Sequence, residues 1–225
     1  MTKKVVINIC SIRNPDWASI NSIFGVWMSA NNDLQISFGN ESQDSLICRA
    51  RSIVASEFLT QTDADVLLFI DDDIVWNPDA IKQIVDEAIA QKTIICGAYR
   101  IKNLKEHRLA IHYLNDDPIT IGPNAPGLVE VKYASSGFMA IPRNVLKSVS
   151  ETLPLVDSGA GNKPDGTPNC LFYPFFHPFY PEGTYLSEDY AFCHRARDLG
   201  FKIYIDTKIS LGHIGKCTFW PDRVE

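Results

Sequence analysis

Short, wholly apolar runs alternate along the chain with longer segments in which apolar residues recur every three or four positions. The run 66–70 (Val-Leu-Leu-Phe-Ile) predicts a strand that is buried on both faces, as in a parallel sheet. Further strands are predicted at 5–10, 34–38, 93–96, 133–141 and 201–205. Helices are predicted at 17–30, at 45–59, after Asn77, after Pro142 and from Ser187 to Leu199. This alternation predicts one α/β domain with a central, mostly parallel sheet flanked by helices.

Three aspartates, Asp71–Asp73, follow the most apolar run and precede the helix that Asn77 and Pro78 begin. They therefore lie at the carboxyl end of a strand, the edge at which open α/β sheets bind ligands. If the strand continues, Asp71 and Asp73 point to one side and Asp72 to the other. Two carboxylates on one side suit Mg²⁺ or Mn²⁺, which also bind phosphate oxygens. The alternative is a solvated acidic turn.

Other polar positions near the predicted strand ends are weaker signals when taken singly. Arg13 follows the first strand and either holds a nucleotide or lies in a solvated connection. Arg49 and Arg51 oppose the dipole at the start of their helix, so at least one should have a carboxylate or phosphate partner. Gly137 interrupts a strand, which often marks the close approach of a ligand or of another backbone.

The second half of the chain adds two chemical candidates and one unusual loop. Glu188 and Asp189 begin a helix, where acidic residues are common and stabilising. His213 is flanked by glycines and suits a metal site, although a lone histidine is usually structural. Residues 154–183 are rich in proline, glycine and aromatic residues, which predicts a long ordered loop over a cleft. Its rings either stack on sugar faces or pack in a core. The helix at 17–30 has an apolar face that we expect in the core, formed by Ile20, Ile23, Phe24, Trp27 and Met28.

Composition narrows the class of protein. A length of 225 residues suits one domain, and a net charge of −6 argues against general nucleic-acid binding. No apolar run approaches the length of a membrane span, and the apolar start at 5–9 is too short for a signal peptide. Six cysteines without a C-x-x-C pair indicate free thiols in a reducing compartment. We therefore expect a cytoplasmic protein; its oligomeric state stays open.

Five motifs together resemble the GT-A-fold glycosyltransferases, and the resemblance spans nearly the whole chain. The segment 69–73 (F-I-D-D-D) resembles their D-x-D motif, 187–193 (S-E-D-Y-A-F-C) their later E-D element, and 211–215 (L-G-H-I-G) their late histidine. The segment 50–52 (A-R-S) resembles an A-R-N stretch of small bacterial, phage and giant-virus members, with serine in place of asparagine. The segment 137–143 (G-F-M-A-I-P-R) resembles their G-F-M-x-I-x-R stretch.

This resemblance implies a single Rossmann-like GT-A domain over 1–225, with a nucleotide-sugar-binding half at 1–110 and an acceptor-binding half at 111–225. The implied activity is that of a metal-dependent hexosyltransferase. Its donor would be a UDP- or GDP-linked sugar, its acceptor a glycan or another hydroxyl compound, and its cofactor Mn²⁺ or Mg²⁺. A virus- or phage-encoded enzyme of this kind would act in the host cytoplasm.

The resemblance also implies roles for individual residues. The metal would be held by Asp71, Asp73 and His213, and the acceptor by Ser136 and Gly137. The donor would be bound by Cys10, Ser11, Arg13, Arg51, Asp71 and Asp72. Asp189 would act as general base, and Glu188 would bind or orient the acceptor. If the enzyme instead retains the sugar configuration, the acidic pair would bind acceptor or donor sugar.

Two other functions fit parts of the pattern. A phosphatase of the haloacid dehalogenase type would use Asp71 as nucleophile within Asp71-x-Asp73-x-Val75. That motif normally lies on the first strand, and we find no convincing late acidic partner for it. A non-catalytic module that binds sugar or Ca²⁺ is the second alternative, although the glycine expected after the aspartates of a calcium loop is missing.

Overall fold

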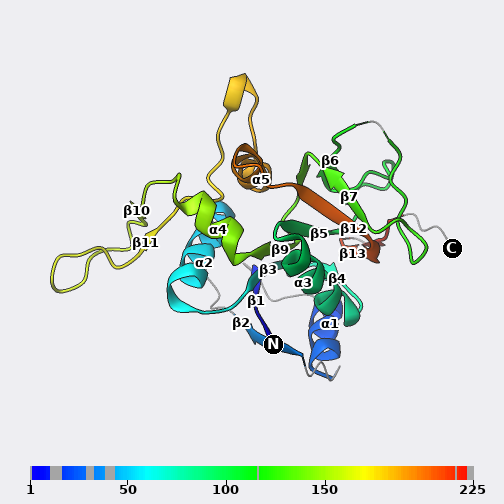
Figure 1. The fold of residues 1–225 in the computed structure, drawn as a ribbon, viewed down its shortest axis with the longest axis horizontal. Coiled ribbons are helices and arrows are strands. Elements are labelled where there is room, and N and C mark those ends of the chain that lie inside the picture. The colour runs from blue at the N-terminus through cyan, green and yellow to red at the C-terminus, as the bar shows by residue number, and fades with distance from the viewer. Residues whose placement is uncertain are drawn as a thin grey trace.

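A seven-stranded sheet forms the centre of the computed structural model (Figure 1). The structure describes residues 2–10, 17–28, 33–38, 44–115, 117–215 and 217–221, and the side chains of residues 10 and 26–28 fall outside the description. In spatial order the strands are β2 (Leu34–Phe38), β1 (Lys3–Cys10), β3 (Val66–Asp71), β9 (Phe138–Pro142), β5 (Ile94–Ala98), β12 (Ile203–Ser210) and β7 (Leu128–Val131). Strands β9 and β7 run opposite to the other five, so the predicted α/β class with a mostly parallel sheet is confirmed.

Smaller sheets decorate the edges of this central one. One has three strands, β4 (Ile74–Val75), β13 (Gly212–Ile214) and β14 (Thr218–Phe219). Two others are pairs: β6 (Ile111–His112) with β8 (Tyr133–Ala134), and β10 (Val156–Asp157) with β11 (Leu171–Phe172). The β10–β11 hairpin projects from the body of the molecule (Figure 1).

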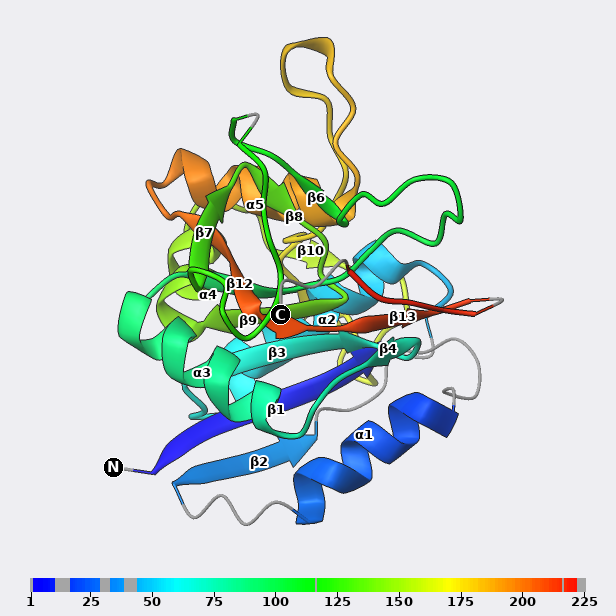
Figure 2. The same cartoon turned by 90° about the vertical axis from the view of Figure 1, so that its right-hand side faces the viewer.

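Helices cover both faces of the sheet (Figure 2). They are α1 (Trp17–Met28), α2 (Ile47–Gln61), α3 (Asp79–Gln91), α4 (Arg143–Ser150), α5 (Glu188–Asp198) and the short 3₁₀ turn η1 (Pro181–Gly183). Helices α2, α4 and α5 bury their apolar residues in one core, and α3 buries its own in a second core across the sheet. Because the central strands meet a core on each face, every residue from Val66 to Ile70 is fully buried.

Helix α1 differs from the sequence prediction. Phe24 is 62% exposed and so lies outside the core, whereas Ile23 of the same predicted face packs against the second core. The helix instead buries two serines against the segment after the aspartates. Ser19 Oγ donates to the Ile74 carbonyl at 2.8 Å, and Ser22 Oγ accepts from the Trp76 amide at 3.2 Å. Apolar spacing alone did not indicate this polar contact.

The aromatic part of the predicted loop at 154–183 packs against the α2–α5 side of the sheet. Phe175 and Phe176 are fully buried, and Phe176 stacks on Phe192 of α5 with ring centroids 4.6 Å apart. Two serines one turn apart on α2 hold the loop backbone: Ser52 Oγ accepts from the Phe176 amide at 3.0 Å, and Ser56 Oγ accepts from the Tyr173 amide at 2.9 Å. These rings therefore belong to the core, as the packing alternative predicted.

We expect Phe176→Ala to lower the free energy of unfolding by about 3–5 kcal/mol, because it removes a buried ring and leaves a cavity. Urea unfolding with an unchanged slope measures this loss. Tyr180→Ala is the matched control, since Tyr180 lies in the same loop but is 74% exposed. A loss below about 1 kcal/mol for Phe176→Ala would contradict the packing role of the loop.

Candidate active site

The acidic turn and the late histidine are brought together by the three-stranded sheet. Strand β3 ends at Asp71, and Asp72 and Asp73 form a turn that leads into β4. Strand β13 pairs with β4, with His213 opposite Ile74, and the Ile214 amide donates to the Asp73 carbonyl at 2.8 Å. Residues 140 positions apart in the sequence therefore lie side by side at the carboxyl edge of the main sheet.

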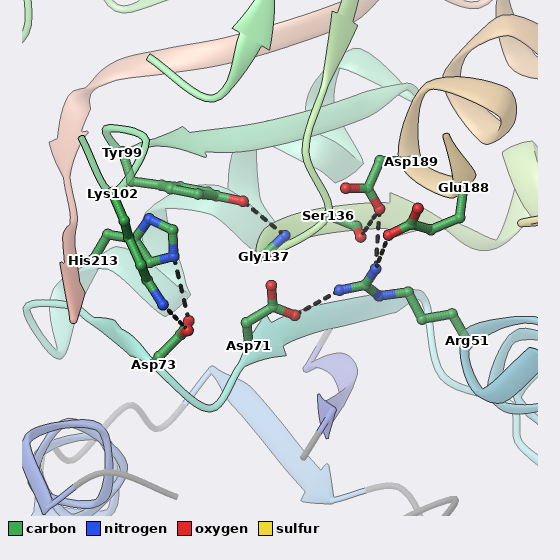
Figure 3. A network of polar contacts seen from close by, with 10 residues as sticks. All are labelled: Arg51, Asp71, Asp73, Tyr99, Lys102, Ser136, Gly137, Glu188, Asp189 and His213. Atoms are coloured by element: carbon green, nitrogen blue, oxygen red, sulfur yellow. Dashed lines mark hydrogen bonds and ion pairs between the residues drawn. The ribbon is translucent and has the colours of Figure 1, made fainter. Parts of the chain in front are cut away.

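Asp73 lies between an imidazole and an ammonium group (Figure 3). His213 Nε2 is 3.5 Å from Asp73 Oδ1, and Lys102 Nζ donates to Asp73 Oδ2. Burial opposes the ionisation of Asp73, but His213 and Lys102 outweigh it and hold the pKa of this carboxyl below its usual value. His213 Nδ1 is 2.8 Å from the Arg100 carbonyl, which only accepts hydrogen bonds. Nδ1 therefore carries a proton, and Nε2 is the ring nitrogen that faces Asp73.

Asp71 and Asp73 contact different groups, Asp71 on the side of Arg51 and Asp73 on the side of His213 (Figure 3). The strand alternation stops at Asp71 because the next two residues turn. Asp71 Oδ1 accepts from Arg51 Nη2 at 2.6 Å. Burial raises the pKa of Asp71 above its usual value, the negative charges of Asp189 and Asp73 add to the rise, and Arg51 opposes it.

Arg51 joins three carboxylates that come from two distant elements (Figure 3). Its side chain is only 3% exposed, and it lies on α2. Nη1 is 3.0 Å from Asp189 Oδ1 and 3.3 Å from Glu188 Oε1, both on the first turn of α5. Burial and the neighbouring Asp189 raise the pKa of Glu188. The predicted carboxylate partner of the arginines near this helix start is therefore present.

Ser136 and Gly137 complete the floor of the site. Ser136 Oγ donates to Asp189 Oδ1, and the Gly137 amide donates to Tyr99 Oη at 3.1 Å. A Cβ atom on Gly137 would lie 2.5 Å from that Tyr99 oxygen and 2.9 Å from Asp71 Oδ2. Only glycine fits here, so the glycine in this strand does mark a close approach, by Tyr99 and Asp71.

The three proposed metal ligands do not form a ready cluster, since no group of three such side chains converges within the described residues. The pair of Asp73 and His213 nevertheless fits a divalent cation. Within the described residues Asp73 Oδ1 is buried without a hydrogen-bond partner, and it faces His213 Nε2. A carboxylate and an imidazole whose other nitrogen is held by a carbonyl are the donors that Mn²⁺ accepts.

Some predicted site residues cannot be placed. Ser11 and Arg13 lie outside the described residues, and so does the side chain of Cys10, whose backbone pairs with Asp71. Asp72 is half-buried in the turn after β3. Tyr99 and Lys102 lie in the segment 97–102, which follows a predicted strand; its aromatic and basic groups either line a site or cover the sheet edge, and here both contact site residues.

The comparisons with known proteins agree with this geometry. Residues 49–150 match the family model described as glycosyl transferase family 2. This segment contains Arg51, the three aspartates and Ser136–Gly137. A search of curated proteins gave no match. Neither the phosphatase nor the binding-module alternative is supported.

A solved structure shows the same fold at low sequence identity. The crystal structure of A197 from STIV is 17% identical, with a TM-score of 0.61, over 98% of this chain and 92% of that chain. The structure of S. aureus TarS 1-349 is 13% identical over 92% of this chain and 58% of that chain, and its TM-score of 0.44 is too low to carry an argument. The likeness to A197 concerns the fold alone.

We expect Arg51→Met to destabilise the fold by about 3–5 kcal/mol at neutral pH, because it leaves three carboxylates together without their shared cation. The loss should shrink as pH falls, since protonated carboxyls no longer need the cation. Denaturant unfolding at pH 7.5 and pH 5 measures both effects. Arg49→Met is the control on the same helix, because the Arg49–Asp44 pair is more exposed and should matter little. An equal loss at both pH values would contradict the electrostatic explanation.

Proposed function

We propose, from the premise that this chain is a glycosyltransferase with the GT-A fold, that it moves a hexose from a UDP- or GDP-linked donor to an acceptor hydroxyl. The reaction would depend on Mn²⁺ or Mg²⁺. In this proposal residues 1–110 bind the nucleotide sugar and residues 111–225 bind the acceptor. No helix in the described part of the chain is long and apolar enough to cross a membrane, and we propose that the enzyme acts in the cytoplasm.

The observation that carries the proposal is the facing pair of Asp73 and His213 at the strand edge. Asp73 Oδ1 and His213 Nε2 lie 3.5 Å apart, and within the described residues Oδ1 is buried without a hydrogen-bond partner; both atoms are of the kind that bind a divalent cation. A divalent cation held there would neutralise the charge that develops on the leaving diphosphate. Asp71 lies two residues before Asp73 in the chain and is held by the hydrogen bond that Arg51 donates to it.

Lys102 supplies a second positive charge at the same place. Its Nζ contacts Asp73, and its carbon chain passes within 3.4 Å of the position of a Cβ on Gly215. It is partly exposed, with 37% of its side chain accessible, so it can turn from Asp73 to a phosphate oxygen without crossing the core. We propose that Lys102 binds the donor diphosphate together with Cys10, Ser11, Arg13 and Asp72.

Asp189 is oriented to accept the proton of the acceptor hydroxyl. Its Oδ1 takes the hydrogen bonds from Arg51 and Ser136, and within the described residues Oδ2 takes none. Oδ2 would accept the hydroxyl proton while the acceptor oxygen bonds to the anomeric carbon and the sugar–phosphate bond breaks. Displacement of this kind inverts the sugar configuration. Glu188, Ser136 and Gly137 would bind or orient the acceptor beside it.

We expect Asp73→Asn to reduce metal-dependent donor hydrolysis and transfer about 100-fold or more. The variant loses a carboxylate that would hold the divalent cation, and with the cation the charge that stabilises the leaving diphosphate. A thermal-shift screen of UDP- and GDP-sugars with and without MnCl₂ provides an independent measurement, because a bound ligand raises the unfolding midpoint. The metal-dependent part of that shift should disappear in the variant. Asp157→Asn, on the projecting β10–β11 hairpin, is the matched control. No response of the unmodified protein to any nucleotide sugar would refute the proposal.

We expect Asp189→Asn to lower the kcat of transfer about 10²–10⁴-fold, the usual contribution of a general base. The amide keeps the size of the side chain but takes up a proton far less readily. Donor binding, measured by the thermal shift with Mn²⁺, should be retained. A kcat within a few-fold of the unmodified enzyme would remove Asp189 from the base role.

A further inference from the structure

A cavity of about 770 Å³ lies between α5, the β6–β8 pair and the η1 loop, and the residues discussed so far do not line it. Its size is within the range of small-molecule sites. The helix contributes Tyr190, His194 and Asp198, which recur at four-residue spacing and so share one face. The opposite wall is formed by residues 181–186 of the η1 loop.

Aromatic rings dominate the walls of this cavity. Tyr133 and Tyr190 lie with ring centroids 5.3 Å apart, and His112 packs on both at 5.7 and 6.3 Å. Tyr133 is further fixed by the hydrogen bond, 2.9 Å long, between its hydroxyl and His194 Nδ1. Tyr133 is only 5% exposed, and Lys132 Nζ lies 5.4 Å from the centre of its ring, so Tyr133 supports from behind the rings of Tyr190 and His112, which form the aromatic wall. Such a wall suits the C–H face of a pyranose ring, which is apolar while its rim carries hydroxyls.

The η1 loop holds a further ring opposite this wall. The Leu186 amide donates to the Phe179 carbonyl at 2.8 Å, which closes the base of the loop. Glu182 and Gly183 both adopt left-handed conformations, with φ of 51° and 80°, and this tightens the turn. Tyr185 is left 68% exposed at the cavity, with no ring contact or side-chain hydrogen bond within the described residues.

Charges in the cavity balance one another. Lys132 and Arg197 carry two positive charges, and Glu182 and Asp198 carry two negative ones. Such a site gives no general advantage to a polyanion or a polycation. The lining also offers hydroxyl, carboxylate and ammonium groups that can exchange hydrogen bonds with sugar hydroxyls. A neutral carbohydrate fits this combination better than a nucleotide or a charged peptide.

The cavity adjoins the acidic pair of the active site. Leu186 and Tyr190 line it, and they flank Glu188 and Asp189 on the same short stretch of chain. Asp189 faces Arg51, whereas the next residue, Tyr190, faces the cavity. An acceptor whose terminal hydroxyl lies at Asp189 could therefore extend its following sugar units over the first turn of α5 into the cavity.

We infer that this cavity is an extension subsite for a neutral oligosaccharide acceptor, in which Tyr185 and the wall of Tyr190 and His112 hold sugar rings beyond the one that reacts. This inference rests on the proposed glycosyltransferase reaction. It assigns to the cavity a preference for chains over monosaccharides, because only a chain reaches both Asp189 and the aromatic wall.

Saturation-transfer difference NMR on the full chain tests the inference with cellotriose, maltotriose, chitotriose and mannotriose, and with glucose as the monosaccharide reference. At least one trisaccharide should receive saturation more strongly than glucose. Tyr185→Ala should weaken the binding of that trisaccharide about 10-fold, the effect of losing roughly 1.4 kcal/mol of ring contact. Tyr180→Ala is the matched control, because Tyr180 is a similarly exposed ring of the same loop that does not line the cavity.

The possible outcomes distinguish a failure of the oligosaccharide subsite from a failure of the proposed glycosyltransferase reaction. Absence of binding by all four trisaccharides, or equal binding by the Tyr185→Ala and Tyr180→Ala variants, overturns the subsite. Displacement of the bound trisaccharide by a charged peptide or by heparin at equal concentration also overturns it, because the cavity would then not be selective for neutral chains. Donor hydrolysis with Mn²⁺, in which water replaces the acceptor, is measured separately on the unmodified enzyme. Its absence counts against the proposed function and says nothing against a cavity that binds trisaccharides.

Discussion

The buried guanidinium of Arg51 is the interaction on which the rest of the site depends. It contacts Asp71 from the main sheet and both Glu188 and Asp189 from α5. One positive charge faces three carboxylates; burial raises the pKa values of Asp71 and Glu188, and the neighbouring carboxylates add to the rise. Arg51 fixes the positions of the three acids through one shared cation.

The order of the strands brings the Arg51 cluster and the Asp73–His213 pair to one edge of the sheet. Strands β1, β3 and β9 are neighbours, so the ends of β1 and β3 and the Ser136–Gly137 bend before β9 meet there. The small β4–β13–β14 sheet then places His213 beside Asp73. The Arg51 cluster and the Asp73–His213 pair are thus separate groups, joined through the turn at residues 71–73.

The sequence indicated most of the elements, because buried strands such as 66–70 and amphipathic helices such as 79–91 carry periodic signals. It did not show where the strand stops, because the turn at 72–73 is followed by the pairing of β4 with β13, a strand far along the chain. It also placed Phe24 in the core, since the contact of Ser19 with Ile74 that orients the helix depends on long-range packing. The sequence indicated that the segment 97–102 could line a site, but it could not pair Lys102 with Asp73, because that contact is made only in the folded chain.

The pair of serines on α2 has a consequence for how this molecule tolerates change. Ser52 follows Arg51 in the sequence, and together with Ser56 it ties the backbone at 173–176 to the helix that carries the arginine. The excursion between residues 157 and 171 is therefore anchored at its base and protrudes freely beyond it (Figure 1). Its tip is therefore a place where we expect the chain to tolerate changes of length, or a grafted peptide, without moving the Arg51 cluster.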